Sequence, residues 1–300
     1  MATVPYPILC LPDSVLQKSL KLMGVVEHLC LSILSKNIKQ LIATLKGYPK
    51  CFSFKFVPFT SITVVGKRFE NFNFCFDIDE STQNAELRSY TDEGTYITLT
   101  VPGFTEKHWI EHVAYVLCRH NSIKLVLWEP NIDEVYEIVK DMETVAVDIA
   151  SSEIQSCHLL KLFPSLRYLE VYKAPINTQI LSHNLFHLEV TTKVTLNDIL
   201  ISNCSNFSIS GNDVSDMELN LFMRSWIKGS NPRLTKFCIH NSPRVRDPYF
   251  ETLLFQNMNY IETHKNKYWR TFEISRPDGT KAIIEWNPVY NFYFNMTVQH

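Results

Sequence analysis

The sequence predicts an α/β protein with three parts: a module of three short helices, a domain of repeating strands and helices, and a C-terminal β-hairpin. Three observations support this fold class. Apolar residues recur at helical spacing before residue 47, short apolar strands alternate with helix-like segments after residue 122, and Arg276-Pro277-Asp278-Gly279 separates two alternating segments. With 300 residues and 45% hydrophobic content, the chain can bury a sizeable core. We expect the helical module at 7–49 and the second domain at 50–300.

The first helix is predicted to begin at Pro12, because the missing N–H of proline has no partner in a first helical turn. Asp13 in the same turn faces the positive end of the helix dipole. Gly24 is predicted to end the helix. Its apolar residues recur at helical spacing at Val15, Leu16, Leu20 and Met23.

A second helix is predicted from Val25 to Ile33, and Ser35 is placed to cap a third. The third helix has an apolar face and ends before Gly47 and Pro49. Three short helices cannot hide this many apolar side chains among themselves. The surplus is therefore expected to dock either on the rest of the chain, as a helical cap, or on a partner.

The order of residues in this module resembles the F-box, over roughly residues 7–46. The resemblance is carried by Leu11-Pro12-x-x-Val15-Leu16, then Leu20, then Glu27-x-Leu29-x-Leu31-Ser32-x-Leu34-Ser35-Lys36. It implies binding to a small Skp-type adaptor, which joins a cullin-based ubiquitin ligase. The adaptor-facing positions that it implies are Leu11, Pro12, Leu16, Leu20 and Leu29. Exposure of Leu16 and Leu20 in the isolated protein would favour this contact, and inward packing would count against it.

Composition excludes several classes of function. A net charge of −2 and a pI near 6.6 argue against partners such as nucleic acid or an anionic membrane surface. No apolar stretch approaches the length of a membrane span. No two of the eight cysteines lie closer than twenty positions, which excludes zinc-finger spacing and favours buried thiols in a reducing compartment, the cytoplasm or nucleus.

Residues 51–101 have the alternation of β-strands. Phe52, Phe54 and Phe56 alternate with polar residues, and similar segments follow around Ile62, Phe74 and Ile97. The polar segment 77–94 is predicted to be a loop. Its acidic residues Asp77 and Asp79 are expected to lie in an ordinary turn between strands, since no further ligand spacing accompanies them.

Residues 105–119 are predicted to form a helix capped by Thr105. Its His108-x-x-Glu111-His112 matches the spacing of a zinc peptidase motif. The large apolar side chains occupy a different arc of the helix, so the two histidines are expected to face water instead of a cleft. We therefore predict no metal site here, with zinc peptidase activity kept as a third hypothesis.

A repeat of strand and helix begins after this helix. The equivalent strand positions are predicted to be Leu125, Val145, Leu169, Leu188, Phe207 and Phe237, separated by 19 to 30 residues. Helical segments are expected near 132–142, 154–163, 177–181, 197–201 and 215–228. This period is typical of a leucine-rich-repeat-like solenoid, in which neighbouring units bury each other's apolar faces. An ordinary α/β sheet is the structural alternative.

The segment Leu219–Leu234 is predicted to be an amphipathic helix, a glycine stop, a turn and a buried strand. Its Trp226-x-x-Gly229-x-Asn231-x-Arg233-Leu234 resembles the type-2 F-box-associated domain of nematode F-box proteins, which we place near 180–250. Trp226 and Leu234 are expected in the core, and Arg233 is expected to be solvated.

The C-terminal hairpin is predicted from Thr271 to Ser275 and from Ala282 to Trp286. The following aromatic tail is expected to pack against the last repeats as a cap. This tail contains Tyr290, Phe292, Tyr293 and Phe294.

The chain contains only eight glycines and no P-loop, nucleophile elbow or dinucleotide-binding pattern. We therefore predict no catalytic residues, no cofactor and no enzyme activity. The predicted function is that of a substrate-recognition adaptor, which binds a Skp-type protein through the F-box and a target protein through residues 50–300. The alternative is a repeat scaffold for protein interaction outside the ubiquitin system.

Overall fold

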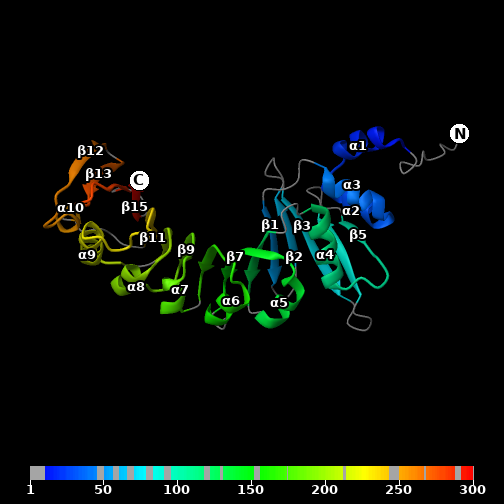
Figure 1. Ribbon diagram of the computed structural model, residues 1–300, viewed down its shortest axis with the longest axis horizontal. Coiled ribbons are helices and arrows are strands. Elements are labelled where there is room, and N and C mark those ends of the chain that lie inside the picture. The colour runs from blue at the N-terminus through cyan, green and yellow to red at the C-terminus, as the bar shows by residue number, and fades with distance from the viewer. Residues whose placement is uncertain are drawn as a thin grey trace. The chain divides into compact units, whose positions relative to one another are not determined.

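The computed structural model describes most of the chain, in the ranges 11–45, 51–56, 61–65, 71–78, 84–90, 96–117, 122–128, 131–151, 156–173, 175–211, 214–242, 250–266, 268–287 and 292–299. Its residues form a mixed α/β fold with helices at the N-terminus and extensive β-sheet structure (Figure 1). The chain divides into two compact units, Met1–Thr144 and Val145–His300. None of the described helices is long and apolar enough to cross a membrane.

Unit 1 begins with the three predicted helices, α1 (Asp13–Leu22), α2 (Val25–Leu34) and α3 (Lys36–Thr44). Pro12 precedes α1 with an extended ψ of 143°, and its carbonyl accepts the first helical hydrogen bonds from the backbone N–H groups of Val15 and Leu16. The helix thus begins one residue later than predicted. Ser35 is the N-cap residue of α3, as predicted, but its side chain makes no capping hydrogen bond.

The sheet of unit 1 has the strand order β6-β1-β2-β3-β4-β5, in which β1 and β6 are parallel and the other pairs antiparallel. Ala85 and Leu87 alternate inward in β4, which lies inside the segment predicted to be a loop; that prediction is wrong because the polar residues lie between these buried positions. The strands are β1 (Cys51–Phe56), β2 (Ser61–Val65), β3 (Asn71–Ile78), β4 (Ala85–Tyr90), β5 (Tyr96–Leu99) and β6 (Ser122–Leu127). The other helices of this unit are α4 (Glu106–Leu117) and α5 (Ile132–Val139).

Unit 2 contains five parallel strands that lie side by side in the order of the sequence. They are β7 (Glu143–Ile149), β8 (Tyr168–Val171), β9 (His187–Val190), β10 (Asn206–Ser210) and β11 (Lys236–Ser242). One helix connects each strand to the next: α6 (Ser156–Leu162), α7 (Thr178–Ser182), α8 (Leu196–Ile201) and α9 (Asp216–Ile227). These helices follow one another along the same side of the strands (Figure 1).

The register of the parallel strands confirms three predicted pairings and corrects one. Leu169, Leu188, Phe207 and Phe237 are paired across β8 to β11. On β7 the partner of Leu169 is Val147, so Val145 was assigned two residues too early. The error has a simple cause: Val145-x-Val147-x-Ile149 is apolar at three alternate positions, and a shift of two residues keeps the same face inward.

The C-terminal strands continue the sheet of unit 2 with antiparallel pairs in the order β11-β15-β14-β13-β12. The elements are α10 (Phe250–Leu254), β12 (Ile261–Lys265), β13 (Arg270–Ser275), β14 (Lys281–Asn287) and β15 (Phe292–Gln299). Strand β15 returns to lie beside β11, and the Phe294 and Phe237 rings are 6.1 Å apart. The predicted hairpin and cap are both confirmed, although Tyr290 lies outside the described residues. Gly279 has a φ of 90°, which the tight turn requires.

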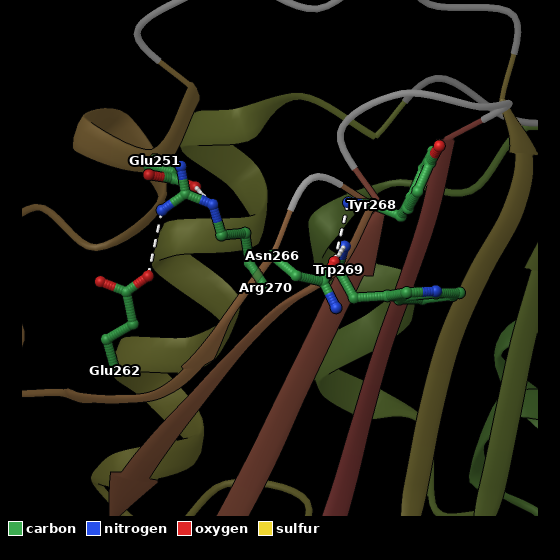
Figure 2. A network of polar contacts seen from close by, with 6 residues as sticks. All are labelled: Glu251, Glu262, Asn266, Tyr268, Trp269 and Arg270. Carbon is green, nitrogen blue, oxygen red and sulfur yellow. Dashed lines mark hydrogen bonds and ion pairs between the residues drawn. The ribbon is translucent and has the colours of Figure 1, made fainter.

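The edge of this sheet is held by a polar network around Arg270 (Figure 2). The guanidinium lies 3.4 Å from Glu251 of α10 and 3.0 Å from Glu262 of β12. In the turn between β12 and β13, the side-chain oxygen of Asn266 accepts hydrogen bonds from the backbone N–H groups of Tyr268 and Trp269, at 2.8 and 2.7 Å. Charged side chains of this kind keep an exposed edge strand from pairing with other chains.

Candidate functional site

The helices α1, α2 and α3 form the candidate protein-interaction module, and its interior is built from leucine and isoleucine. Leu20, Leu29 and Ile42 are fully buried. The buried His28 of α2 donates from Nε2 to the carbonyl of Leu20 at 2.7 Å and so ties α2 to α1. Burial lowers the pKa of His28, because a charged imidazole would lose its hydration inside the module.

Three of the five residues predicted to face an adaptor point into this interior. Leu16, Leu20 and Leu29 are all buried, whereas Leu11 is partly exposed and Pro12 is exposed. The helical period explains the inward packing, since Leu16 and Leu20 are four residues apart and share one face of α1. By the exposure criterion, the inward packing counts against direct adaptor contact through these three leucines.

Other apolar residues of the module are exposed instead. The exposed fractions are 90% for Leu22, 67% for Leu34 and 44% for Val15. Leu22 and Leu34 lie in the last turns of α1 and α2. These residues carry the surplus apolar surface that the composition of the module predicted. Periodicity alone missed Leu22 because it falls between the positions of the predicted face.

The module docks on helix α4, which contacts α2 and α3 on one side and strand β4 on the other. On the sheet side, Trp109 is fully buried and its indole N–H donates to the carbonyl of Ala85 at 2.6 Å. On the module side, the Lys39 ammonium of α3 lies 4.6 Å above the ring centre of Tyr115. This cation–π contact holds α3 against α4.

His112 lies at the centre of this docking surface and is only 5% exposed. Its Nε2 is 2.7 Å from the hydroxyl oxygen of Ser32 in α2, and that hydroxyl donates to the carbonyl of Leu29, also at 2.7 Å. The Ser32 oxygen therefore acts as the acceptor, and the neutral His112 carries its proton on Nε2. Burial, and secondarily the charge of Lys39, lower the pKa of His112 to about 4.

The prediction that His112 faces water is therefore wrong, because the polar arc of α4 is the surface on which the N-terminal module lies. His108 is used differently: its Nδ1 accepts a hydrogen bond from the backbone N–H of Thr105 at 3.2 Å, in the first turn of α4. The two histidines of the zinc-like motif thus have separate structural partners. Within the described ranges, no three His, Cys, Asp or Glu side chains are grouped to hold a metal ion.

In unit 2, the motif from Trp226 to Leu234 follows α9 and contacts the end of α8. Trp226 and Leu234 are buried, as predicted. Gly229 has a φ of 102° and ends α9. Arg233, which was expected to be solvated, is exposed but donates to the side-chain oxygen of Asn184 before β9.

Asn231 has a structural role that sequence analysis missed. It is buried, adopts a left-handed φ of 49°, and donates from Nδ2 to the carbonyls of Ile199 and Ser202, both at 2.9 Å. These carbonyls lie at the C-terminal end of α8, where helical partners are missing. The signal available in the sequence was an asparagine two residues after a helix-ending glycine, a position compatible with the left-handed conformation.

Arg276 from the C-terminal hairpin likewise donates hydrogen bonds to backbone carbonyls at the C-terminal end of α9. Its Nε donates to the carbonyl of Trp226 at 2.9 Å, and its Nη2 donates to that of Ser230 at 2.7 Å. The guanidinium also lies 4.3 Å from the Trp226 ring centre. The hydrogen bonds of Asn231 and Arg276 thus connect this motif to the end of α8 and to the C-terminal hairpin.

Comparison with known proteins is consistent with both sequence resemblances. The F-box domain family matches residues 8–50, and the family described as F-box associated matches residues 176–239. The F-box associated domain-containing protein sdz-33 of Caenorhabditis elegans is 87% identical over 300 residues, covering the whole of both chains. No solved structure matches the chain at a significant level. The chain therefore belongs to the family of F-box proteins that carry an F-box-associated domain.

Proposed function

We propose that this protein is a substrate-recognition adaptor of a Skp–cullin–F-box ubiquitin ligase. The F-box helices bind a Skp-type adaptor, the adaptor joins a cullin, and unit 2 captures the target protein in the cytoplasm or nucleus. The protein itself supplies no chemistry: it raises the effective concentration of the target near the ligase. The observation that carries this proposal is an F-box module with exposed apolar residues at Val15, Leu22 and Leu34.

The burial pattern refines which residues make the adaptor contact. Pro12, Val15, Leu22 and Leu34 offer exposed apolar surface, while the buried Leu16, Leu20 and Leu29 hold the helices in place. An exposed leucine is costly in water, and its burial by a partner contributes the favourable transfer free energy that drives association. Leu11 is half-exposed and stays a candidate for the same contact.

We also propose that unit 2 is a leucine-rich-repeat-like solenoid. Its five parallel strands follow the sequence order, and a helix connects each strand to the next. This succession differs from a doubly wound sheet, in which the strand order reverses. Strand β15 and the hairpin strands cover the last parallel strand, as a terminal cap of a solenoid must.

The test is co-expression of the full chain with a Skp-type adaptor, followed by size-exclusion chromatography. The test variant is Leu22→Glu with Leu34→Glu. The matched control is Met217→Glu with Ile261→Glu, which places the same charges on exposed apolar residues of unit 2. We expect wild type and control to co-elute with the adaptor and the test variant to elute alone while keeping its circular dichroism spectrum.

The alternative is a protein-interaction scaffold outside the ubiquitin system, in which the module is a cap. The inward packing of Leu16 and Leu20, and the docking of α2 and α3 on α4, favour it. A folded wild-type chain that elutes without the adaptor at micromolar concentration would support this alternative and contradict the ligase proposal.

A further inference from the structure

Strands β8, β9 and β10 of unit 2 have one buried face and one partly exposed face, the open face. Along β8, β9 and β10, side chains alternate between buried and partly exposed positions. The helices α6 to α9 follow one another on one side of these strands, and none of these four lies on the other side (Figure 1). We propose that this open face binds a basic, extended segment of the target protein, rich in Arg or Lys. The proposal rests on the proposed function and names the chemistry of its target.

Carboxylates occupy neighbouring register positions on this face; Glu170 and Glu189 are partly exposed, whereas Asp148 is only 7% exposed. Asp148 on β7 is paired in register with Glu170 on β8, and Glu170 with Glu189 on β9. Neighbouring members of this row are therefore one strand spacing apart, about 4.8 Å. The same row continues through Ser208, Cys238 and Asn295 to Glu285 on β14. The carboxylates are thus held by backbone pairing, and their spacing does not depend on flexible loops.

Two imidazoles lie beside one carboxylate of this row. The Glu189 carboxylate lies 3.8 Å from Nε2 of His187 and 3.3 Å from Nε2 of His240. These imidazoles, His187 first, lower the pKa of Glu189 below its ordinary range. The Tyr172 hydroxyl donates a short hydrogen bond to the Glu170 carboxylate at 2.5 Å.

Exposed aromatic rings lie beside the carboxylates. Tyr168 is 41% exposed and Tyr172 39%. The Tyr168 ring packs at 5.3 Å against Phe186, which is also exposed. Arg and Lys side chains place their cations over such rings while their ends reach a carboxylate. Aromatic rings next to carboxylates, such as Tyr168 and Tyr172 next to Glu170, therefore suit a segment that contains Arg or Lys better than a neutral or acidic segment.

The same row contains a buried amide, that of Asn295. Asn295 is buried, and its amide donates to Glu285 at 3.0 Å. Its oxygen Oδ1 accepts no hydrogen bond from any residue that the structure describes. Among the described basic residues of this face, His187 and His240 lie beside Glu189, Lys281 is paired with Glu273 at 2.8 Å, and Lys236 stands at the start of β11.

The experiment measures binding of a fluorescent peptide of alternating Arg and Ala to the full chain by anisotropy at physiological salt. A peptide of alternating Glu and Ala is the control ligand. The test variant is Glu170→Gln with Glu189→Gln, which removes two charges and keeps the side-chain shape. The control variant is Glu134→Gln with Asp141→Asn, which removes two charges from exposed positions of unit 1.

We expect the basic peptide to bind wild type and the control variant equally, and the test variant roughly tenfold more weakly, the sum of two modest ion pairs. Binding should weaken further with added salt. Equal loss in both variants, or no binding to wild type, would overturn the proposal. The same test variant should still co-elute with a Skp-type adaptor, so a failure of peptide binding is distinguishable from a failure of the ligase proposal.

Discussion

His112 of helix α4 donates a hydrogen bond from Nε2 to the hydroxyl of Ser32 in helix α2, across 2.7 Å. The two residues are eighty positions apart in the sequence. This contact holds the F-box module against helix α4 of the same unit, because the donor and the acceptor are both buried where α2 meets α4. The position of the module relative to the sheet of unit 1 therefore depends on this polar pair together with the contact between Lys39 and Tyr115.

Removal of the Ser32 hydroxyl should weaken this docking. Ser32→Ala leaves the buried Nε2–H of His112 without an acceptor, which costs about 1–3 kcal/mol. The measurement is the free energy of unfolding from urea titration. Thr44→Ala is the matched control, since Thr44 donates the same kind of bond to the carbonyl of Leu41 at 2.7 Å but is exposed. Equal effects of the two substitutions would contradict a special role for the Ser32–His112 pair.

Stability should fall as the pH decreases below 6.5. The pKa of His112 is lowered from 6.5 in the unfolded chain to about 4 in the fold. The unfolded state therefore binds more protons over this window, and the loss reaches about 1 kcal/mol at pH 5.5. Buried His28 shifts in the same direction and adds to the loss.

The measurement is the urea midpoint at pH 7.5 and at pH 5.5, for wild type and for His112→Gln. The variant should show a smaller difference between the two pH values, because glutamine does not titrate. An unchanged pH difference in the variant would show that His112 does not control it.

Two leucines of one helix should behave in opposite ways. Leu20→Ala removes a fully buried side chain and should cost about 2–5 kcal/mol in the free energy of unfolding. Leu22→Ala, two positions later, removes a side chain that is 90% exposed and should change stability by less than about 0.5 kcal/mol. Thermal unfolding of both variants tests this. A large destabilisation by Leu22→Ala would show that Leu22 is packed, and would remove it from the proposed adaptor contact.

Asn231 should contribute through both its conformation and its hydrogen bonds. Asn231→Gly keeps the left-handed backbone but removes the bonds to the end of α8, at about 1–3 kcal/mol. Asn231→Ala adds roughly 1 kcal/mol for the positive φ. Asn257→Gly is the control, because Asn257 has a similar φ of 59° but is exposed, and it should be nearly neutral. Calorimetric midpoints that rank Gly below Ala at position 231 would refute the conformational part.

Much of unit 2 could be predicted from the sequence because its signals are local. Apolar residues at alternate positions predicted strands β8 to β11 in the register that the structure has. The segment Arg276-Pro277-Asp278-Gly279 predicted the hairpin turn between β13 and β14. Where two registers keep the same residues inward, as at Val145 and Val147, the pattern could not choose between them. Strand β4 was missed because only Ala85 and Leu87 are clearly apolar and buried in a polar segment.

The candidate sites were predicted less well, because a site depends on which surfaces meet. The sequence by itself determined the F-box helices, the repeated strands and the family to which the chain belongs. Only the tertiary structure decided that Leu16 and Leu20 are buried while Leu22 is exposed. It also decided that His112 donates a hydrogen bond to Ser32 and does not face water. It also brought Asp148, Glu170 and Glu189 into one row. The physical reason is that helical and strand periods are set by local backbone geometry, whereas burial and pairing depend on residues far apart in the chain.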